Sequence, residues 1–116
     1  MNNLDRLKIE IKGITLTDEE LTIYLQENNL EPTITYNPQS QRDKLAIYNT
    51  ALSILESIAN NPQTMKVYKY EEDITITQFH ENLMARIDQL ERKVRDMKSN
   101  LDKETMSNTT FMLFDS

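Results

Sequence analysis

The feature that most limits the fold of this chain is its single glycine among 116 residues. Average usage of about 7% would give roughly eight glycines at this length. Folds rich in β-strands and tight hairpins use glycine at turn positions that need a positive φ angle. A chain with one glycine has few such turns, and its many leucine, glutamate, glutamine, lysine and methionine residues favour helices. We therefore expect a mostly α-helical fold.

Length and composition exclude several classes of protein. One domain is expected, because chains below about 250 residues have no need to split their core. Without cysteine, neither disulfides nor zinc–thiolate sites are possible. No stretch approaches the roughly 18 consecutive apolar residues of a membrane span, and residues 1–5 lack the basic-then-apolar order of a signal peptide. The net charge of -6 and the shortage of glycine disfavour phosphate-binding loops and nucleic-acid platforms.

Residues 4–12 fit two interpretations. Leu7 and Ile11 lie four positions apart, as on one face of a helix, whereas Ile9 and Ile11 alternate with charged residues as in a strand. Gly13 follows at the place where the C-terminus of a helix favours a positive φ angle. The glycine therefore slightly favours a helix.

The next segment carries a clear signal for the start of a helix. Thr17 and Glu20 have the spacing of a capping box, in which the threonine oxygen accepts from the amide three residues later and the carboxylate reaches back. Leu16 and Leu21 stand where a hydrophobic staple is expected. We predict a helix from this point to about residues 28–29.

Residues 41–59 form the most apolar predicted helix, capped by Ser40 or Asn37 and ended by Pro62. Apolar side chains occupy more than half of its circumference, so it needs contacts on two sides. It is therefore either the central helix of the chain's own core or an interface helix. Its apolar positions are Leu45, Ile47, Tyr48, Ala51, Leu52, Ile54, Leu55, Ile58 and Ala59.

A final long helix is predicted to start at Thr75 or Thr77 and to end near Asn100. The β-branched residues 74–77 could instead add a short strand before it. From Ile87 onward the apolar positions recur three and four apart, as in a heptad seam. We expect the first half of this helix to join the core and the second half to project or to pack as a coil. Its apolar positions are Phe79, Leu83, Ile87, Leu90, Val94, Met97 and Leu101.

Residues 102–116 are predicted to form an extended C-terminal arm beyond a helical-bundle domain of residues 1–101. The arm begins polar and then carries four consecutive large apolar residues, which would be exposed and adhesive unless they dock on something. Docking on the chain's own domain and docking on a neighbouring subunit or partner are both left open. The partner-binding residues of this prediction are Phe111, Met112, Leu113 and Phe114.

The sequence offers little for catalysis, so we expect a protein that is not an enzyme and has no cofactor or metal. His80 is the only histidine, and its neighbour Glu81 points about 100° away on a helix, so the two form no acid–base pair. The acidic residues 71–73 lack the glycine turn and the spaced ligands of a metal loop. The basic residues at positions 86–98 are interleaved with acidic ones, which cancels much of their attraction to phosphates.

Residues 16–97 resemble the head–tail connector (adaptor) proteins of tailed bacteriophages. The segments that carry the resemblance are LTDEELTIYLQENNL, KLAIYNTALSILESIANNP, YKYEEDITITQF and HENLMARIDQLERKVRDM. The most telling part is the β-branched DITIT step directly before the helix that contains NLMARIDQLERK.

The resemblance implies a virion structural protein of the neck, at the head–tail interface, assembled in the host cytoplasm. Such adaptors are helical bundles that form a homo-oligomeric ring beneath the portal protein and extend the DNA channel toward the tail and neck proteins. DNA would pass without specific binding, and no membrane would be involved. No catalytic residues carry over from the resemblance. The oligomer contacts expected on this reading are Ile47, Ile54, Ile58, Leu90, Val94 and Met97.

Two other functions compete with the connector. The first is a cytosolic helical interaction module that dimerises through a coiled coil at residues 87–101. The second is a metal-dependent accessory enzyme that uses the acidic residues 71–73.

Overall fold

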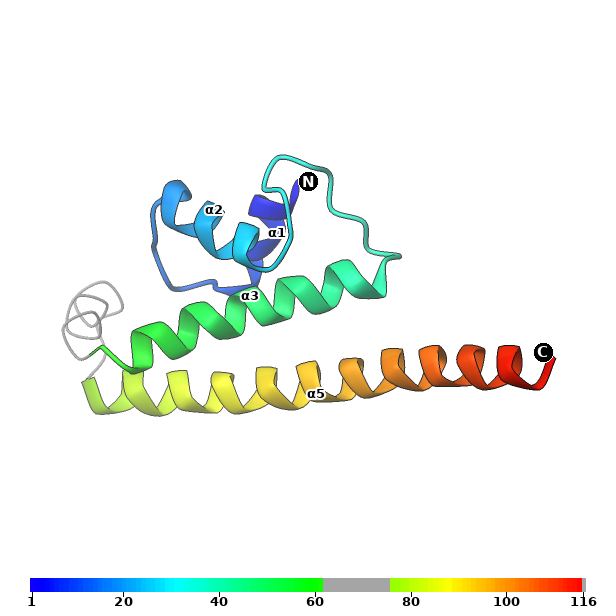
Figure 1. Ribbon diagram of the computed structural model, residues 1–116. Coiled ribbons are helices and arrows are strands. Elements are labelled where there is room, and N and C mark those ends of the chain that lie inside the picture. Colours follow the sequence, from blue (N-terminus) through cyan, green and yellow to red (C-terminus); the bar gives the residue numbers. More distant parts are fainter. Residues whose placement is uncertain (62–75, 116) are drawn as a thin grey trace.

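Helices make up most of the chain, as its shortage of glycine predicts. The computed structural model describes the backbone of residues 1–61 and 76–115 and the side chains of residues 1–61 and 77–103. Within these ranges no β-strand occurs, and one isolated bridge pairs Asn2 with Thr35. The helices are α1 (Asn3–Glu10), α2 (Asp18–Glu27), α3 (Gln41–Ala59) and α5 (Ile76–Asp115) (Figure 1).

The first segment is a helix, and its ends explain why. The Asn2 side chain accepts a hydrogen bond from the amide of Asp5 at 2.8 Å, which caps one of the free amides at the start of α1. Ile11 caps the other end, and Gly13 then takes a positive φ of 96° that turns the chain back toward α2. The helical interpretation of this segment is confirmed.

The capping box at the start of α2 is present, with one difference from the expectation. The amide of Glu20 donates to the Thr17 hydroxyl at 3.2 Å, and the same hydroxyl donates to the Glu20 carboxylate at 3.2 Å. Leu16 is half-buried and Leu21 is fully buried, at the two positions of the staple. The helix ends at Glu27, at the expected place.

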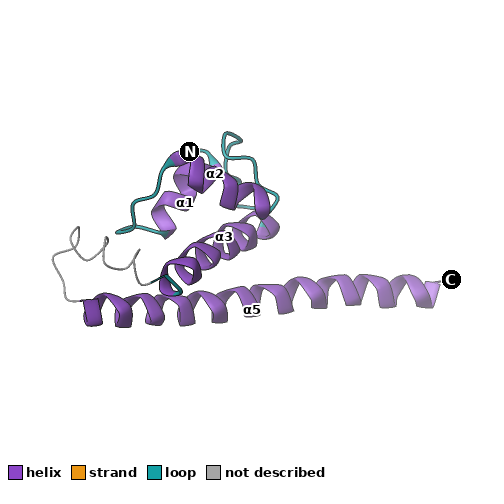
Figure 2. Ribbon diagram, turned by 60° about the vertical axis from the view of Figure 1, so that its left-hand side comes forward, coloured by secondary structure: helices purple, strands orange, loops and turns teal. Residues whose placement is uncertain are grey.

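The described helices form layers with α3 in the middle. The Ser40 hydroxyl caps α3 by accepting from the amide of Asp43 at 3.1 Å. Both α1 and α2 pack on one side of α3, and α5 packs along the other side (Figures 1 and 2). The wide apolar stripe of α3 is therefore covered from two sides within one chain, and most of the core lies at this double contact. The buried apolar residues are Leu7, Ile11, Leu21, Leu25, Leu30, Ile47, Tyr48, Ala51, Ile54, Leu55, Ile58, Phe79, Leu83, Ile87, Leu90 and Val94.

Most of the residues expected to make oligomer contacts lie in the core of the single chain. Ile47, Ile54 and Ile58 of α3, with Leu90 and Val94 of α5, are at most 6% exposed within the single chain. Side chains that are already covered have almost no surface to offer a second copy. The sequence left open whether these residues pack in the chain's own core or at an interface. Packing in the chain's own core accounts for their burial. Met97 is half-buried against the same core.

The last helix is longer than predicted. It was expected to end near Asn100, but α5 continues to Asp115. Residues 102–115 contain neither proline nor glycine, so the sequence has no strong stop signal there. The longest dimension of the molecule is 61 Å, which matches about 60 Å for a 40-residue helix. The C-terminal arm is therefore helical in its backbone and projects past the N-terminal end of α3, because the two helices run antiparallel (Figure 1).

Parts of the prediction fall outside the described residues. Ile76 and Thr77 belong to the first turn of α5, so they are not in a strand, while residues 74–75 are not described. The acidic residues 71–73 and the turn expected at residues 64–68 are not described either. Among the helices that are described, none is both long and apolar enough to cross a membrane.

Candidate functional site

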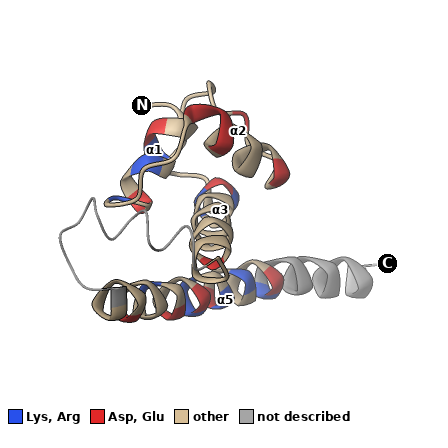
Figure 3. Ribbon diagram, turned by 90° about the vertical axis from the view of Figure 1, so that its left-hand side faces the viewer, with Lys and Arg blue, Asp and Glu red and all other residues tan. Residues whose placement is uncertain are grey.

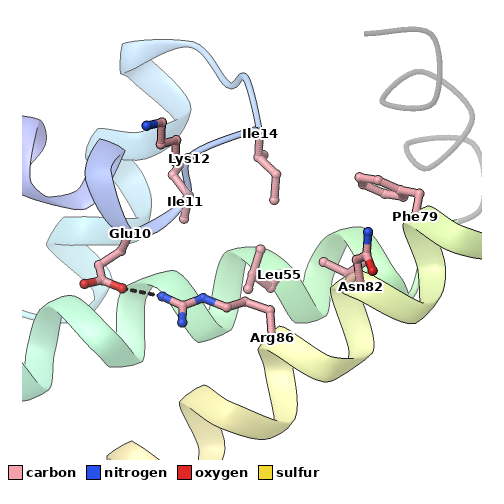
Figure 4. Close-up of a pocket in the computed structure, with 9 residues that line it drawn as sticks. Glu10, Ile11, Lys12, Ile14, Leu55, Phe79, Asn82 and Arg86 are labelled. Carbon is pink, nitrogen blue, oxygen red and sulfur yellow. Dashed lines mark hydrogen bonds and ion pairs between the residues drawn. The ribbon is translucent and has the colours of Figure 1, made fainter. Parts of the chain in front are cut away.

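A cleft lies where the end of α1, the C-terminal part of α3 and the start of α5 meet (Figure 4). Its volume is about 150 Å³. The cleft forms because α1 and α2 pack on α3 and do not pack along α5. Its lining residues are Glu10, Ile11, Lys12 and Ile14 from the end of α1, Leu55 from α3, and Phe79, Asn82, Leu83 and Arg86 from α5.

Local sequence explains how the α1 side of the cleft is made. The helix stops at Glu10, and the positive φ of Gly13 lets the chain reverse instead of running on toward α5. Ile11 is therefore buried and Ile14 is half-buried above α3 (Figure 4). A residue with a Cβ atom at position 13 would resist this turn.

The floor of the cleft is apolar. Leu55, Phe79 and Leu83 are nearly covered, and Ile11 closes the opposite side. A space of this volume is smaller than the roughly 300–1,000 Å³ of typical small-molecule sites. Engineered apolar cavities of about 150 Å³ hold one benzene molecule. The cleft is thus suited to one large apolar side chain rather than to a cofactor.

One wall of the cleft is an ion pair between α1 and α5. The Glu10 Oε2 atom lies 2.6 Å from Arg86 Nη2, and its Oε1 atom lies 2.7 Å from Arg6 Nη2. The side chains of Glu10 and Arg6 are only 12% and 15% exposed, whereas that of Arg86 is 39% exposed. A single carboxylate therefore pairs with two guanidinium groups, of which that of Arg6 is largely buried and that of Arg86 is partly exposed.

The Arg6 guanidinium is also held by aromatic rings. Its central carbon lies 5.3 Å from the ring centre of Tyr36 and 5.9 Å from that of Tyr48, within the range of cation–π attraction. Its buried Nη1 atom has no hydrogen-bond partner among the described residues. Burial lowers the pKa of Arg6, but the hydrogen bond and charge of Glu10 outweigh it, with a contribution from Tyr36, so the pKa is raised.

The aromatic contact continues to α5. Lys93 places its ammonium group 4.4 Å from the ring centre of Tyr48. Tyr48 of α3 therefore contacts cations from both α1 and α5. These contacts join the layers of the bundle at the edge of the apolar core, of which Tyr48 is itself a member.

The structure brings together residues that the sequence analysis did not single out. Arg6 and Glu10 form an i,i+4 pair, which is visible in the sequence and could have been noted. Arg86 was considered only as part of a basic run, and its partner lies 76 positions away. Nothing local in the sequence reveals that pairing.

The predicted partner-binding residues lie in the last turns of α5, and their side chains are outside the described set. Those residues are Phe111, Met112, Leu113 and Phe114. His80 is exposed near the start of α5. Within the described residues, no group of three or more histidine or acidic side chains is placed to bind a metal ion.

Comparison with known proteins gives no match: no family model fits the sequence, and no curated protein or solved structure is significantly similar to it. The likeness to phage connectors therefore stays a prediction from the sequence.

Proposed function

We propose that this chain is a non-enzymatic structural subunit of a phage head–tail connector, assembled as a ring beneath the portal protein. In that role it extends the DNA channel from the portal toward the tail. The proposal combines the resemblance of residues 16–97 to connector proteins with the way the helices are arranged. Its place would be the neck of the virion, after assembly in the host cytoplasm.

The observation that carries the proposal is that α5 runs beyond the core it helps to form. Among the side chains of α5 that the structure describes, Val94 is the last buried one, and Met97 and Leu101 are half-buried. Residues 102–115 then continue the helix past the N-terminal end of α3 (Figures 1 and 2). These 14 residues span about 21 Å at 1.5 Å per residue. A projecting helix with four large apolar residues near its end is suited to attachment. Attachment to neighbouring proteins is the task of a connector subunit.

The same packing weakens the coiled-coil alternative. A dimer through residues 87–101 needs the seam of Ile87, Leu90 and Val94 to face a second chain. In the structure these three side chains are buried within the chain, and α5 packs along α3. A coiled-coil dimer would have to displace α3 from them.

Charge distribution fits a channel that carries DNA. The α2 helix contains four acidic residues and no basic one, and all four are exposed (Figure 3). They are Asp18, Glu19, Glu20 and Glu27. A surface of this kind repels the phosphate backbone, so DNA would slide past it without binding. We therefore assign the outer face of α2 to the channel side of the proposed ring.

The metal-dependent enzyme alternative depends on residues 71–73, which lie outside the described residues. No contact in the described part of the chain favours it.

Native mass spectrometry of the chain, with and without the portal ring of the same phage, tests the proposal. We expect several copies to bind each portal ring and an excess of free chains to remain unbound. A stable dimer that ignores the portal would contradict the proposal and support the interaction module. Thermal stabilisation by a divalent cation alone would support the accessory enzyme.

A further inference from the structure

Two buried polar atoms have no hydrogen-bond partner in the described part of the chain, and both belong to α1. They are Oδ1 of Asn3 and Nη1 of Arg6. A nitrogen of each side chain is bonded, since Asn3 Nδ2 donates to the Glu31 carbonyl at 2.8 Å and Arg6 Nη2 donates to Glu10 at 2.7 Å. Asn3 is 3% exposed, and the side chain of Arg6 is 15% exposed. Unpaired polar atoms at such depth are costly, so the two atoms call for a partner.

Both atoms belong to side chains that face the contact between α1 and residues 31–36. The backbone of Asn3 donates to the Ile34 carbonyl at 2.9 Å, and the Arg6 guanidinium lies over the ring of Tyr36. Asn3 and Arg6 are three positions apart on one helix, so their side chains leave the same side of it, with Cβ atoms about 5–6 Å apart. The acceptor and the donor do not bond to each other, although they share this contact.

The chemistry of the two atoms determines which ligand can join them. A cation would be repelled by the Arg6 guanidinium, and an anion would be repelled by the Asn3 oxygen and the nearby Glu10 carboxylate. The ligand is therefore a neutral group that both donates and accepts a hydrogen bond. It is also small, because both atoms are covered by the protein. Water meets each of these conditions, and folded proteins hold about one buried water per 27 residues at polar atoms of this kind.

We propose that one water molecule is bound between α1 and residues 31–36, where it donates to Asn3 Oδ1 and accepts from Arg6 Nη1. Immobilising one water costs less than leaving both atoms unpaired. The water completes a chain of hydrogen bonds that starts at the Glu31 carbonyl, runs along α1 and ends at Arg86 of α5. This inference goes beyond the proposed function and does not depend on it.

A high-resolution crystal structure of the full chain tests the site directly. We expect a water oxygen at about 2.7–3.2 Å from both Asn3 Oδ1 and Arg6 Nη1. A direct bond between the two atoms overturns the inference. An Nη1 atom that packs on the ring of Tyr36 with no water beside it overturns the inference as well.

Oxygen-17 relaxation dispersion tests the site in solution, because it counts the waters that stay bound inside a protein. Asn3→Leu keeps the size of the side chain and removes the acceptor, so we expect one long-lived water fewer than in the wild type. Loss of the bond to Glu31 alone would leave this number unchanged. Asn100→Leu is the matched control, since Asn100 is exposed on α5, and it should keep the number of the wild type.

The donor side is tested with Arg6→Met, which removes Nη1 while Glu10 keeps its pair with Arg86. We expect the loss of one long-lived water here too. Arg92→Met is the matched control, because the side chain of Arg92 is 71% exposed, and it should lose none. Circular dichroism should show that all variants keep the helical content of the wild type.

The double variant of Asn3→Leu with Arg6→Met gives the sharpest result. If one water bridges the two atoms, the double variant loses one long-lived water in total, as each single variant does. A loss of two waters would mean that the atoms bind separate waters, and the bridge would be wrong. An Asn3→Leu variant that keeps the number of the wild type would also overturn the inference.

Discussion

Glu10 and Arg86 connect the first and last described helices directly, with 2.6 Å between the Glu10 Oε2 and Arg86 Nη2 atoms. The two residues are 76 positions apart in the sequence. Elsewhere α1 and α5 are joined through α3, on which both pack. The second oxygen of Glu10 is bonded to Arg6, so one carboxylate holds two cations from different helices. The ion pair therefore fixes one wall of the cleft.

Replacing Glu10 with glutamine should destabilise the fold by about 1–3 kcal/mol, measured by urea unfolding. The change leaves the guanidinium of Arg6 buried without its carboxylate, and breaking a buried pair in this way is costly. Arg86→Met is the comparison, with an expected loss below about 1 kcal/mol, because Arg86 is 39% exposed and water can replace part of its contact. Equal losses for the two variants would contradict the unequal burial of the pair.

Replacing Gly13 with alanine should cost about 1 kcal/mol or more. Gly13 has a φ of 96°, a value at which a Cβ atom is crowded. Asn29 also has a positive φ, 63°, so Asn29→Gly serves as the reciprocal control and should change the stability by less than about 0.5 kcal/mol. The change in stability of each variant is measured from the midpoint of thermal unfolding, followed by circular dichroism. A harmless Gly13→Ala would show that the turn after α1 has another conformation.

Replacing Thr17 with alanine should cost about 1 kcal/mol, because the amide of Glu20 loses the hydroxyl that caps it. Glu19→Gln changes a neighbouring exposed residue that has no part in the cap, and its effect should stay within about 0.5 kcal/mol. Chemical denaturation of the three proteins compares the two changes directly. Similar stability for both variants would rule out a contribution of the cap.

Replacing Leu90 with alanine should cost about 2–5 kcal/mol, because its side chain is fully buried between α5 and α3. Met84→Ala, on the exposed side of the same helix, should cost less than about 0.5 kcal/mol. This pair also separates core from interface, because a core residue has the same effect at every protein concentration. A loss for Leu90→Ala that appears only at high protein concentration would instead support a contact of Leu90 with a second copy of the chain.

The parts of the fold that the sequence predicted well depend on local signals. Thr17 and Ser40 cap α2 and α3 through hydroxyl groups three residues before the amides they bind, so both starting points could be read directly. Asn60 ends α3 just before Pro62, which cannot continue a helix. Such signals act over one or two helical turns. Every residue that takes part in one of them is therefore close by in the sequence.

The parts of the fold that the sequence analysis missed depend on contacts between residues that are far apart in the sequence. The spacing of Ile87, Leu90 and Val94 indicated a seam but not which helix would cover it, and α3 of the same chain does so. The predicted end of the last helix near Asn100 is too early, because no helix breaker follows and α5 continues to Asp115. The cleft depends on the pairing of Glu10 with Arg86, which no local pattern encodes.

Deleting residues 108–116 should separate attachment from folding. The last fully buried residue of α5 in the described set is Val94, and the half-buried Leu101 lies seven positions before the deletion. The shortened chain should therefore keep the melting temperature of the full chain and lose only the helical signal of the residues removed. It should no longer bind the portal ring, because the apolar residues 111–114 are gone. The control is a chain shortened by Asp115 and Ser116 alone, which keeps the apolar run and should still bind the portal ring. If the larger deletion instead unfolds the domain, residues 108–116 belong to the chain's own core, and the attachment role of the arm is wrong.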